Sequence, residues 1–110
     1  MKFKRGDIVL AASPGDYGKP RPCLVLQSEL FDDLPSVTFC MLTTTLRDDQ
    51  TLLRINIAPS SENGLHQPSQ IAIDKITTLP VARITKKVGT ADDTVMLQVT
   101  RALAVFLGVG

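Results

Sequence analysis

Two short polar stretches of the sequence carry the residues best suited to chemistry on a phosphate. Arg21 stands between two prolines, at the start of the apolar run 23–26. Each proline fixes its own φ, and Pro22 biases Arg21 toward an extended backbone. A guanidinium held in this way can present two parallel donors to an anion. The second stretch is Thr43-Thr44-Thr45, followed by Arg47, at the end of another apolar run.

Each of these features also has a plain structural explanation. Arg21 could pair with a carboxylate such as Asp7 or Asp74, and the threonines could be ordinary β-branched strand residues. Asp74 itself could be a structural turn carboxylate. The single histidine, His66, lies in a polar region where no neighbouring residues complete a Ser-His-Asp arrangement. We therefore interpret it as a loop residue before considering it as a general acid.

Most familiar catalytic and cofactor signatures are absent from the sequence. It has no Gly-rich phosphate loop, no GxSxG, no HExxH and no paired CxxC. Cys23 and Cys40 lack the spacing of metal ligands and fall in apolar runs, so we expect both in the core. The sequence therefore predicts neither a metal site nor a cofactor.

Length and composition predict one soluble domain over residues 1–110. The chain has 44% hydrophobic and 21% charged residues and a net charge of +1. It has no apolar stretch long enough to cross a membrane and no signal peptide, so we expect a cytoplasmic protein. Affinity for phosphate would have to come from local clusters of cations. Each cluster could equally consist of ordinary solvated surface charges. These clusters are Lys2, Lys4 and Arg5; Lys19 and Arg21; and Lys86 and Lys87.

The patterning predicts many short strands and one helix. Apolar or alternating runs favour strands at 8–12, 22–27, 37–43, 51–58 and 70–74, with smaller ones at 77–79 and 83–88. Both faces of 37–43 are largely apolar, so this strand should be central. Residues 29–34 suit one helical turn, 46–49 a hairpin turn, and 13–20 and 59–68 polar loops. In 51–58, Arg54 and Asn56 alternate with apolar residues and should face solvent.

The helix is expected at the C-terminal end. Thr90 can cap it, Asp92 and Asp93 suit the positive end of its dipole, and Gly108 suits its end. An apolar stripe at helical spacing comprises Val95, Val99, Ala102, Leu103 and Phe106. The expected fold is mainly β: a strongly bent antiparallel sheet or partly closed barrel, with the C-terminal helix packed against it.

Taken in order, these features resemble the MazF/PemK family of toxins. The resemblance rests on Arg5-Gly6-Asp7-Ile8-Val9, the block 19–26, Leu42-Thr43-Thr44 and the acidic start of the C-terminal helix. It covers nearly the whole chain. It implies a small SH3-like barrel and a metal-independent endoribonuclease that cleaves single-stranded RNA. It also implies a homodimer that a cognate antitoxin blocks, and the apolar faces of 37–43 suit such a dimer.

The resemblance implies catalytic roles for Arg21 and Thr43. Arg21 would stabilise charge on the phosphate, and the Thr43 hydroxyl would hold the phosphate or the 2′-hydroxyl in line. One branch of the family places an arginine two residues before an aspartate that Asp74 matches, but here that position is Ala72. The substrate-binding candidates are Lys19, Thr44, Arg47, His66 and Asp74.

Two alternatives stay open at this point. A toxin of the same fold could poison DNA gyrase without being an enzyme, as the CcdB branch does, and would not need Arg21 and Thr43 in one cleft. A degenerate relative could bind only an antitoxin or RNA. We expect base contacts to come from the loops 13–20 and 59–68.

Overall fold

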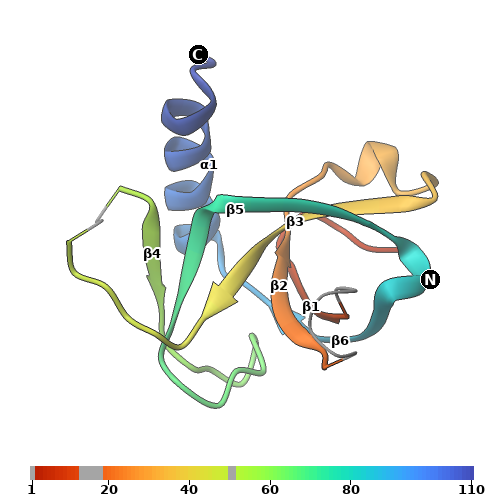
Figure 1. Ribbon diagram of the computed structural model, residues 1–110, viewed down its shortest axis with the longest axis horizontal. Coiled ribbons are helices and arrows are strands. Elements are labelled where there is room, and N and C mark those ends of the chain that lie inside the picture. Colours follow the sequence, from red (N-terminus) through yellow and green to blue (C-terminus); the bar gives the residue numbers. More distant parts are fainter. Residues whose placement is uncertain (1, 13–18, 50–51) are drawn as a thin grey trace.

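The computed structural model describes residues 2–12, 19–49 and 52–110 of the chain, so much of the predicted loop 13–20 lies outside them. Within these ranges, six strands form one antiparallel sheet and one α-helix follows them (Figure 1). The strands are β1 (Asp7–Ala11), β2 (Arg21–Val25), β3 (Ser36–Thr43), β4 (Arg54–Ile57), β5 (Ser69–Pro80) and β6 (Ile84–Thr90). Two 3₁₀ turns, η2 (Glu29–Phe31) and η3 (Val81–Arg83), precede β3 and β6, and α1 (Asp93–Leu107) comes last.

The strand order is β4-β5-β3-β2-β1-β6, which confirms that β3 is central. β3 has a neighbouring strand along each edge, β2 and β5. Its apolar side chains on both faces suit a strand that is covered on both faces. The predicted hairpin turn at 46–49 is wrong, because β4 pairs with β5 and not with β3. The described residues after β3 instead run beside the start of β5, where the Arg47 backbone is hydrogen-bonded to the Gln70 side chain.

β5 replaces two predicted strands with one strand of 12 residues. Its pairing with β3 shifts between Cys40, which pairs with Ile76, and Met41, which pairs with Ala72. Residues 73–75 are therefore extra on β5 and form a bulge, and bulges bend a strand. Figure 1 shows the resulting turn in β5. β4 lies along the part of β5 that precedes this turn, residues 69–72.

The predicted class, mainly β with a C-terminal helix, is confirmed. The sheet is strongly bent but does not close into a barrel, because β4 and β6 form its two edges in the described residues. None of the described helices is long and apolar enough to cross a membrane.

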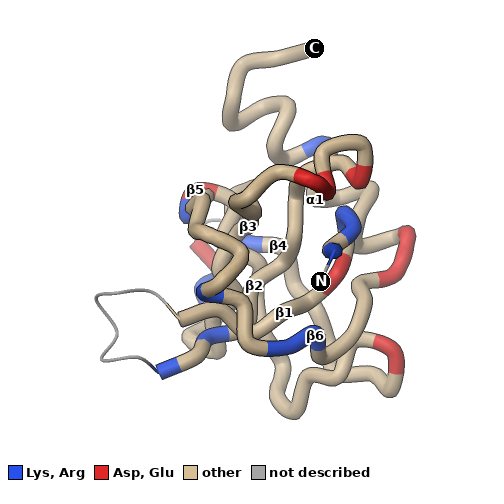
Figure 2. Tube along the Cα trace, turned by 90° about the vertical axis from the view of Figure 1, so that its right-hand side faces the viewer, with Lys and Arg blue, Asp and Glu red and all other residues tan. Residues whose placement is uncertain are grey.

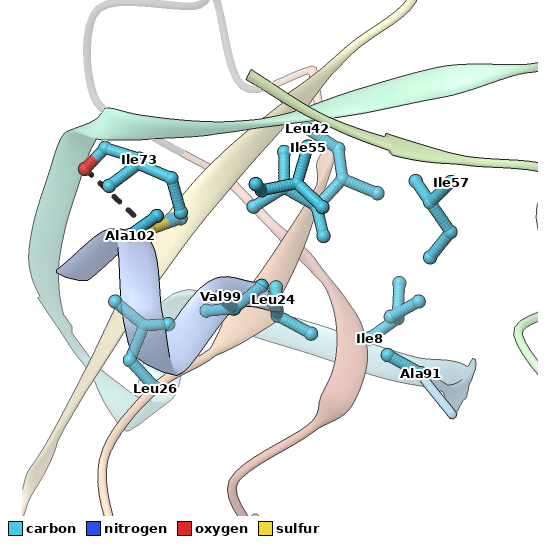
Figure 3. Close-up of a cluster of buried hydrophobic side chains, with 12 residues drawn as sticks. Ile8, Leu24, Leu26, Leu42, Ile55, Ile57, Ile73, Ala91, Val99 and Ala102 are labelled. Atoms are coloured by element: carbon cyan, nitrogen blue, oxygen red, sulfur yellow. Dashed lines mark hydrogen bonds between the residues drawn. The ribbon is translucent and has the colours of Figure 1, made fainter. Parts of the chain in front are cut away.

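Buried side chains fill both faces of the sheet. One cluster lies between the sheet and α1 and includes Leu24, Ile73 and Val99 (Figure 3). The other lies on the opposite face and includes Cys23, Val25 and Phe39. Both faces of β3 are therefore covered by the chain's own residues, so they no longer support a dimer interface.

The helix start differs from the prediction by two residues. Asp92, not Thr90, is the N-cap: its carboxylate accepts a hydrogen bond from the Val95 N–H at 2.8 Å. Thr90 instead ends β6, where it pairs with Asp7. Gly108 ends the helix in the left-handed region with φ of 71°, as predicted.

The apolar stripe of α1 is only partly buried. Val99 and Ala102 are in the core, whereas Phe106 is 44% exposed. Figure 1 shows the reason: the last turns of α1 extend past the sheet, which cannot cover them.

Candidate active site

Arg21 and Thr43 lie opposite each other on neighbouring strands. Cys23 of β2 pairs with Met41 of β3, and continuing that antiparallel register by two residues brings Arg21 opposite Thr43. Opposite residues share a face of the sheet, so both side chains point to the side away from α1. They line one cavity of about 210 Å³, together with Pro22, Leu42, Thr44, Thr45 and Ser69. The structure thus brings together the two residues predicted to be catalytic.

The turn after β3 orients the Thr43 hydroxyl. Its Oγ1 accepts a hydrogen bond from the Thr45 N–H at 3.1 Å. A hydroxyl that accepts from the backbone still has its own proton to donate. Thr43 is half-buried, whereas Thr44 and Thr45 are exposed at the mouth of the cavity.

Arg21 is exposed at the first position of β2, where its backbone pairs with Ala11 of β1. The Cys23 thiol donates a hydrogen bond to the Arg21 carbonyl oxygen at 3.4 Å. The two carboxylates considered as its structural partners bind other cations. Asp7 lies 3.1 Å from Lys87, and Asp74 binds Arg54.

His66 borders an adjoining cavity of about 330 Å³. This cavity and the cavity of Arg21 share Pro22, Thr44 and Ser69. Gly64, with φ of 70°, packs the histidine's loop onto β6: a Cβ there would lie 2.1 Å from the Val88 carbonyl oxygen. His66 therefore lies near Thr44 and not in the pocket that Arg21 and Thr43 line.

Arg47 and Lys19 stand apart from the pair. The Arg47 guanidinium donates to both carboxylate oxygens of Asp49, at 3.2 and 3.1 Å, and lines a different cavity. Lys19 is exposed two residues before Arg21.

Asp74 lies on the β5 bulge and lines a fourth cavity, of about 340 Å³, which Cys23 and Met41 also line. Burial raises the pKa of its carboxyl, but the hydrogen bond and charge of Arg54 outweigh that effect, so the pKa lies below its ordinary value. Asp74 is therefore ionised at neutral pH and cannot serve there as a proton donor.

The alternating pattern of 51–58 predicted that Arg54 faces solvent, which is wrong. Its side chain is only 8% exposed, because it lies across β5 and binds Asp74. Arg54 pairs with Ala72 across β4 and β5, and alanine leaves room for the arginine to cross. The sequence contains a small residue, Ala72, two positions before Asp74. Only the pairing of β4 with β5 shows that this space takes the Arg54 side chain.

Both cysteines are buried and free, as predicted. Burial is the main reason that the pKa of each thiol is raised to about 12, so neither is a nucleophile at neutral pH. Across the described ranges, no group of three or more His, Cys, Asp or Glu residues is arranged to hold a metal ion.

Charge is distributed unevenly over the molecule. Figure 2 shows basic segments on β6 and at the lower left, while most acidic segments lie at the top and right. A polyanion approaching the basic side would meet an attractive field.

The comparisons with known proteins agree with this fold. The family model of PemK-like, MazF-like toxins of type II toxin–antitoxin systems matches residues 4–107. A protein named "Probable endoribonuclease MazF" from Mycolicibacterium smegmatis is 47% identical over 108 residues, covering 97% of this chain and 98% of that protein.

Solved structures show the same fold. The Mycobacterium tuberculosis toxin MazF-mt6 matches with a TM-score of 0.80 and 26% identity, covering 94% of this chain and 98% of that one. An endoribonuclease from a mycobacterial species, in complex with its cognate antitoxin, matches with a TM-score of 0.82 and 23% identity, covering 98% and 97%.

The M. smegmatis relative is an endoribonuclease by name, which fits the main expectation and not the gyrase-poisoning alternative. The family model spans nearly the whole chain, and the M. smegmatis protein is similar to it from end to end. The chain therefore belongs to the family of PemK-like, MazF-like toxins of type II toxin–antitoxin systems.

Proposed function

We propose that this protein is the endoribonuclease toxin of a type II toxin–antitoxin pair and that Arg21 and Thr43 carry its chemistry. The observation that carries the proposal is their shared cavity on one face of the sheet. A guanidinium and a hydroxyl that converge on one hollow suit a phosphodiester, because one offers charge and paired donors and the other a single oriented O–H. The names of the relatives support the same activity.

The reaction is attack of a ribose 2′-oxygen on the adjacent phosphorus. The new O2′–P bond forms as the P–O5′ bond breaks. The 2′-hydroxyl gives up its proton and the departing O5′ takes one up, which leaves a 2′,3′-cyclic phosphate and a 5′-hydroxyl. Negative charge builds on the non-bridging oxygens, where Arg21 donates two hydrogen bonds. Thr43 holds the phosphate or the 2′-hydroxyl in line for attack. Arginine is a poor base at neutral pH because of its very high pKa, so its role is charge stabilisation.

The substrate is single-stranded RNA, cut at preferred sequences, and the cleavage uses no metal ion or other cofactor. His66 and Thr44 border the adjoining cavity and are placed to contact nucleotides beside the cut. Lys19 supplies positive charge on the approach to Arg21.

The test is incubation of the purified protein with a long RNA in EDTA. We expect cleavage at full rate, with 5′-hydroxyl ends on the downstream fragments. Cleavage should stop when the nucleotide 5′ of the cut carries 2′-deoxyribose, because the attacking oxygen is then missing. Activity that EDTA abolishes and magnesium restores would contradict the mechanism.

The protein works in the cytoplasm, where its RNA and its antitoxin are made. It forms a homodimer, and the antitoxin inserts an acidic segment that orders as it binds. Support for the dimer comes from apolar side chains left exposed along α1 and just beyond its end. They are Leu97, Val105, Phe106, Leu107 and Val109. A complex with antitoxin in which Arg21 and Thr43 stay open to solvent would rule out direct blockage of the site.

A further inference from the structure

A second polar hollow lies on the same face of the sheet as Arg21 and Thr43, farther across the strands. Thr43 pairs with Gln70 of β5, and Gln70 pairs with Asn56 of β4. Opposite residues share a face, so a polar row runs across four strands from Arg21 to Asn56. At the end of this row is a cavity of about 430 Å³, here called the Asn56 pocket. It is lined by Leu46, Arg47, Asp48, Arg54, Asn56 and Gln70.

Hydrogen bonds hold the walls of the Asn56 pocket in place. Gln70 is 4% exposed, and its amide accepts from the Arg47 N–H at 2.9 Å and donates to the Arg47 carbonyl at 2.8 Å. The same amide donates to Asn56 Oδ1 at 2.9 Å. One buried glutamine thus fixes the loop after β3 against β4 and β5. A site held in this way binds with little loss of conformational entropy.

The charges of the pocket argue against a phosphate as its occupant. Arg47 is paired with Asp49, and Arg54 with Asp74, so both cations are already balanced. Asp48 adds a carboxylate to the lining itself. Neither arginine of the described lining is therefore left to balance the charge of a phosphate. A neutral group with polar edges needs no such balance.

The remaining groups match a nucleobase. The Leu46 side chain, 54% exposed, offers an apolar surface for a flat ring. Asp48 can only accept hydrogen bonds, while Asn56 still has its N–H₂ to donate, because its oxygen is used by Gln70. The four RNA bases place their donors and acceptors in different orders along the Watson–Crick edge, so a fixed acceptor beside a fixed donor can discriminate between them.

We infer that the Asn56 pocket binds the base of a nucleotide flanking the scissile phosphate, and that Asp48 and Asn56 set the base preferred at that position. The inference rests on the proposed function. It assigns part of the sequence preference of RNA cleavage to the Asn56 pocket. It adds a source of base contacts beyond the loops 13–20 and 59–68.

The experiment is to sequence the new 5′-hydroxyl ends made from an RNA pool with random internal sequence. Asn56→Asp keeps the oxygen that Gln70 needs, replaces the amide donor with an acceptor and adds a negative charge. Asp48→Asn converts an acceptor-only group into an amide. Asp33→Asn is the matched control, because Asp33 is an exposed acid on the connection between β2 and β3.

We expect each pocket variant to reduce the base preference about tenfold at one position beside the cut, the discrimination of roughly one hydrogen bond. Preferences at other positions and those of Asp33→Asn should match the wild type. Unchanged preferences in both pocket variants would overturn the inference, even if both cut more slowly, because a merely structural role lowers the rate uniformly.

A second measurement separates this inference from the proposed function. Wild type and variants are titrated with 2′-deoxy-substituted single-stranded RNA hexamers that differ in one base, and binding is followed by fluorescence anisotropy. If the wild type cuts no RNA, the proposed function fails. The inference still stands if base discrimination in binding is lost in both pocket variants. Equal discrimination in wild type and variants, or no binding by the wild type, overturns the inference.

Discussion

At the scale of single residues, Arg21 has the clearest consequence. If its guanidinium stabilises the charge that builds on the phosphate, Arg21→Ala should lower the single-turnover rate at least about a hundredfold, the effect of losing one oxyanion donor. Arg21→Lys should recover little, because one ammonium group cannot match a two-pronged donor. The measurement is cleavage of a short RNA with enzyme in excess.

Folding is the control for this prediction. Arg21 is exposed at the start of β2, so its variants should unfold near the wild-type temperature. If Arg21→Ala cuts at the wild-type rate, or is inactive only because it is unfolded, the catalytic assignment is wrong.

Thr43 allows a finer test. Thr43→Val keeps the β-branched shape and removes the hydroxyl, including the oxygen that accepts from the Thr45 N–H. Thr43→Ser keeps both functions. We expect Thr43→Ser to retain most activity and Thr43→Val to lose it, with single-turnover rates as the measurement. Similar rates for the two variants would indicate that the hydroxyl takes no part in the chemistry.

At the scale of elements, the β5 bulge depends on the pair of Arg54 and Asp74. Removing the cation by Arg54→Met leaves a half-buried carboxylate without its partner, which should lower the free energy of unfolding at pH 7 by about 1–3 kcal/mol. Arg83→Met is the matched control, because Arg83 is exposed in η3. Urea denaturation measures both variants.

The pH dependence of this difference has a definite sign. The pKa of Asp74 is lowered in the folded state, so its contribution to stability is present above the ordinary aspartate pKa of about 3.9. It is lost as the pH falls through the lower, folded value. The gap between wild type and Arg54→Met should therefore be constant near neutrality and shrink in acid. A gap that grows in acid would contradict the pairing.

The loop that carries His66 depends on one glycine. Gly64→Ala places a Cβ against the Val88 carbonyl in addition to straining a positive φ, so β6 or the loop must move. Gly108→Ala has nearly the same φ but nothing within 4 Å of the added atom. We expect Gly108→Ala to cost about 1 kcal/mol and Gly64→Ala clearly more. Equal losses in urea denaturation would show that close packing onto β6 is unimportant.

At the scale of the whole molecule, the exposed apolar end of α1 bears on assembly. Sedimentation at micromolar concentrations should give the mass of a dimer. Phe106→Asp, which places a charge on the exposed last turns, should shift the equilibrium toward monomer. Phe31→Asp is the matched control, because Phe31 in η2 is similarly exposed but lies outside α1. A monomeric wild type, or equal dissociation of both variants, would contradict a dimer formed through α1.

Several features of this protein follow from the sequence alone. Apolar runs with β-branched residues predict the strands, because burial of alternating or continuous apolar side chains is a local pattern. Gly108 predicts the helix end, since a left-handed cap favours glycine. Arg21 and Thr43 could be singled out because prolines and a strand end restrict them before any tertiary contact forms.

Only the tertiary structure decided which strands are neighbours. Strand pairing depends on contacts between distant residues, so the sequence predicted a hairpin where β4 in fact pairs with β5. The same pairing buries Arg54 against Asp74 and lines up Thr43, Gln70 and Asn56 across the sheet. Local patterns specify which face a side chain occupies. The residues that share that face, and so form the pocket beside Arg21 and Thr43, are set by register, which is a property of the whole sheet.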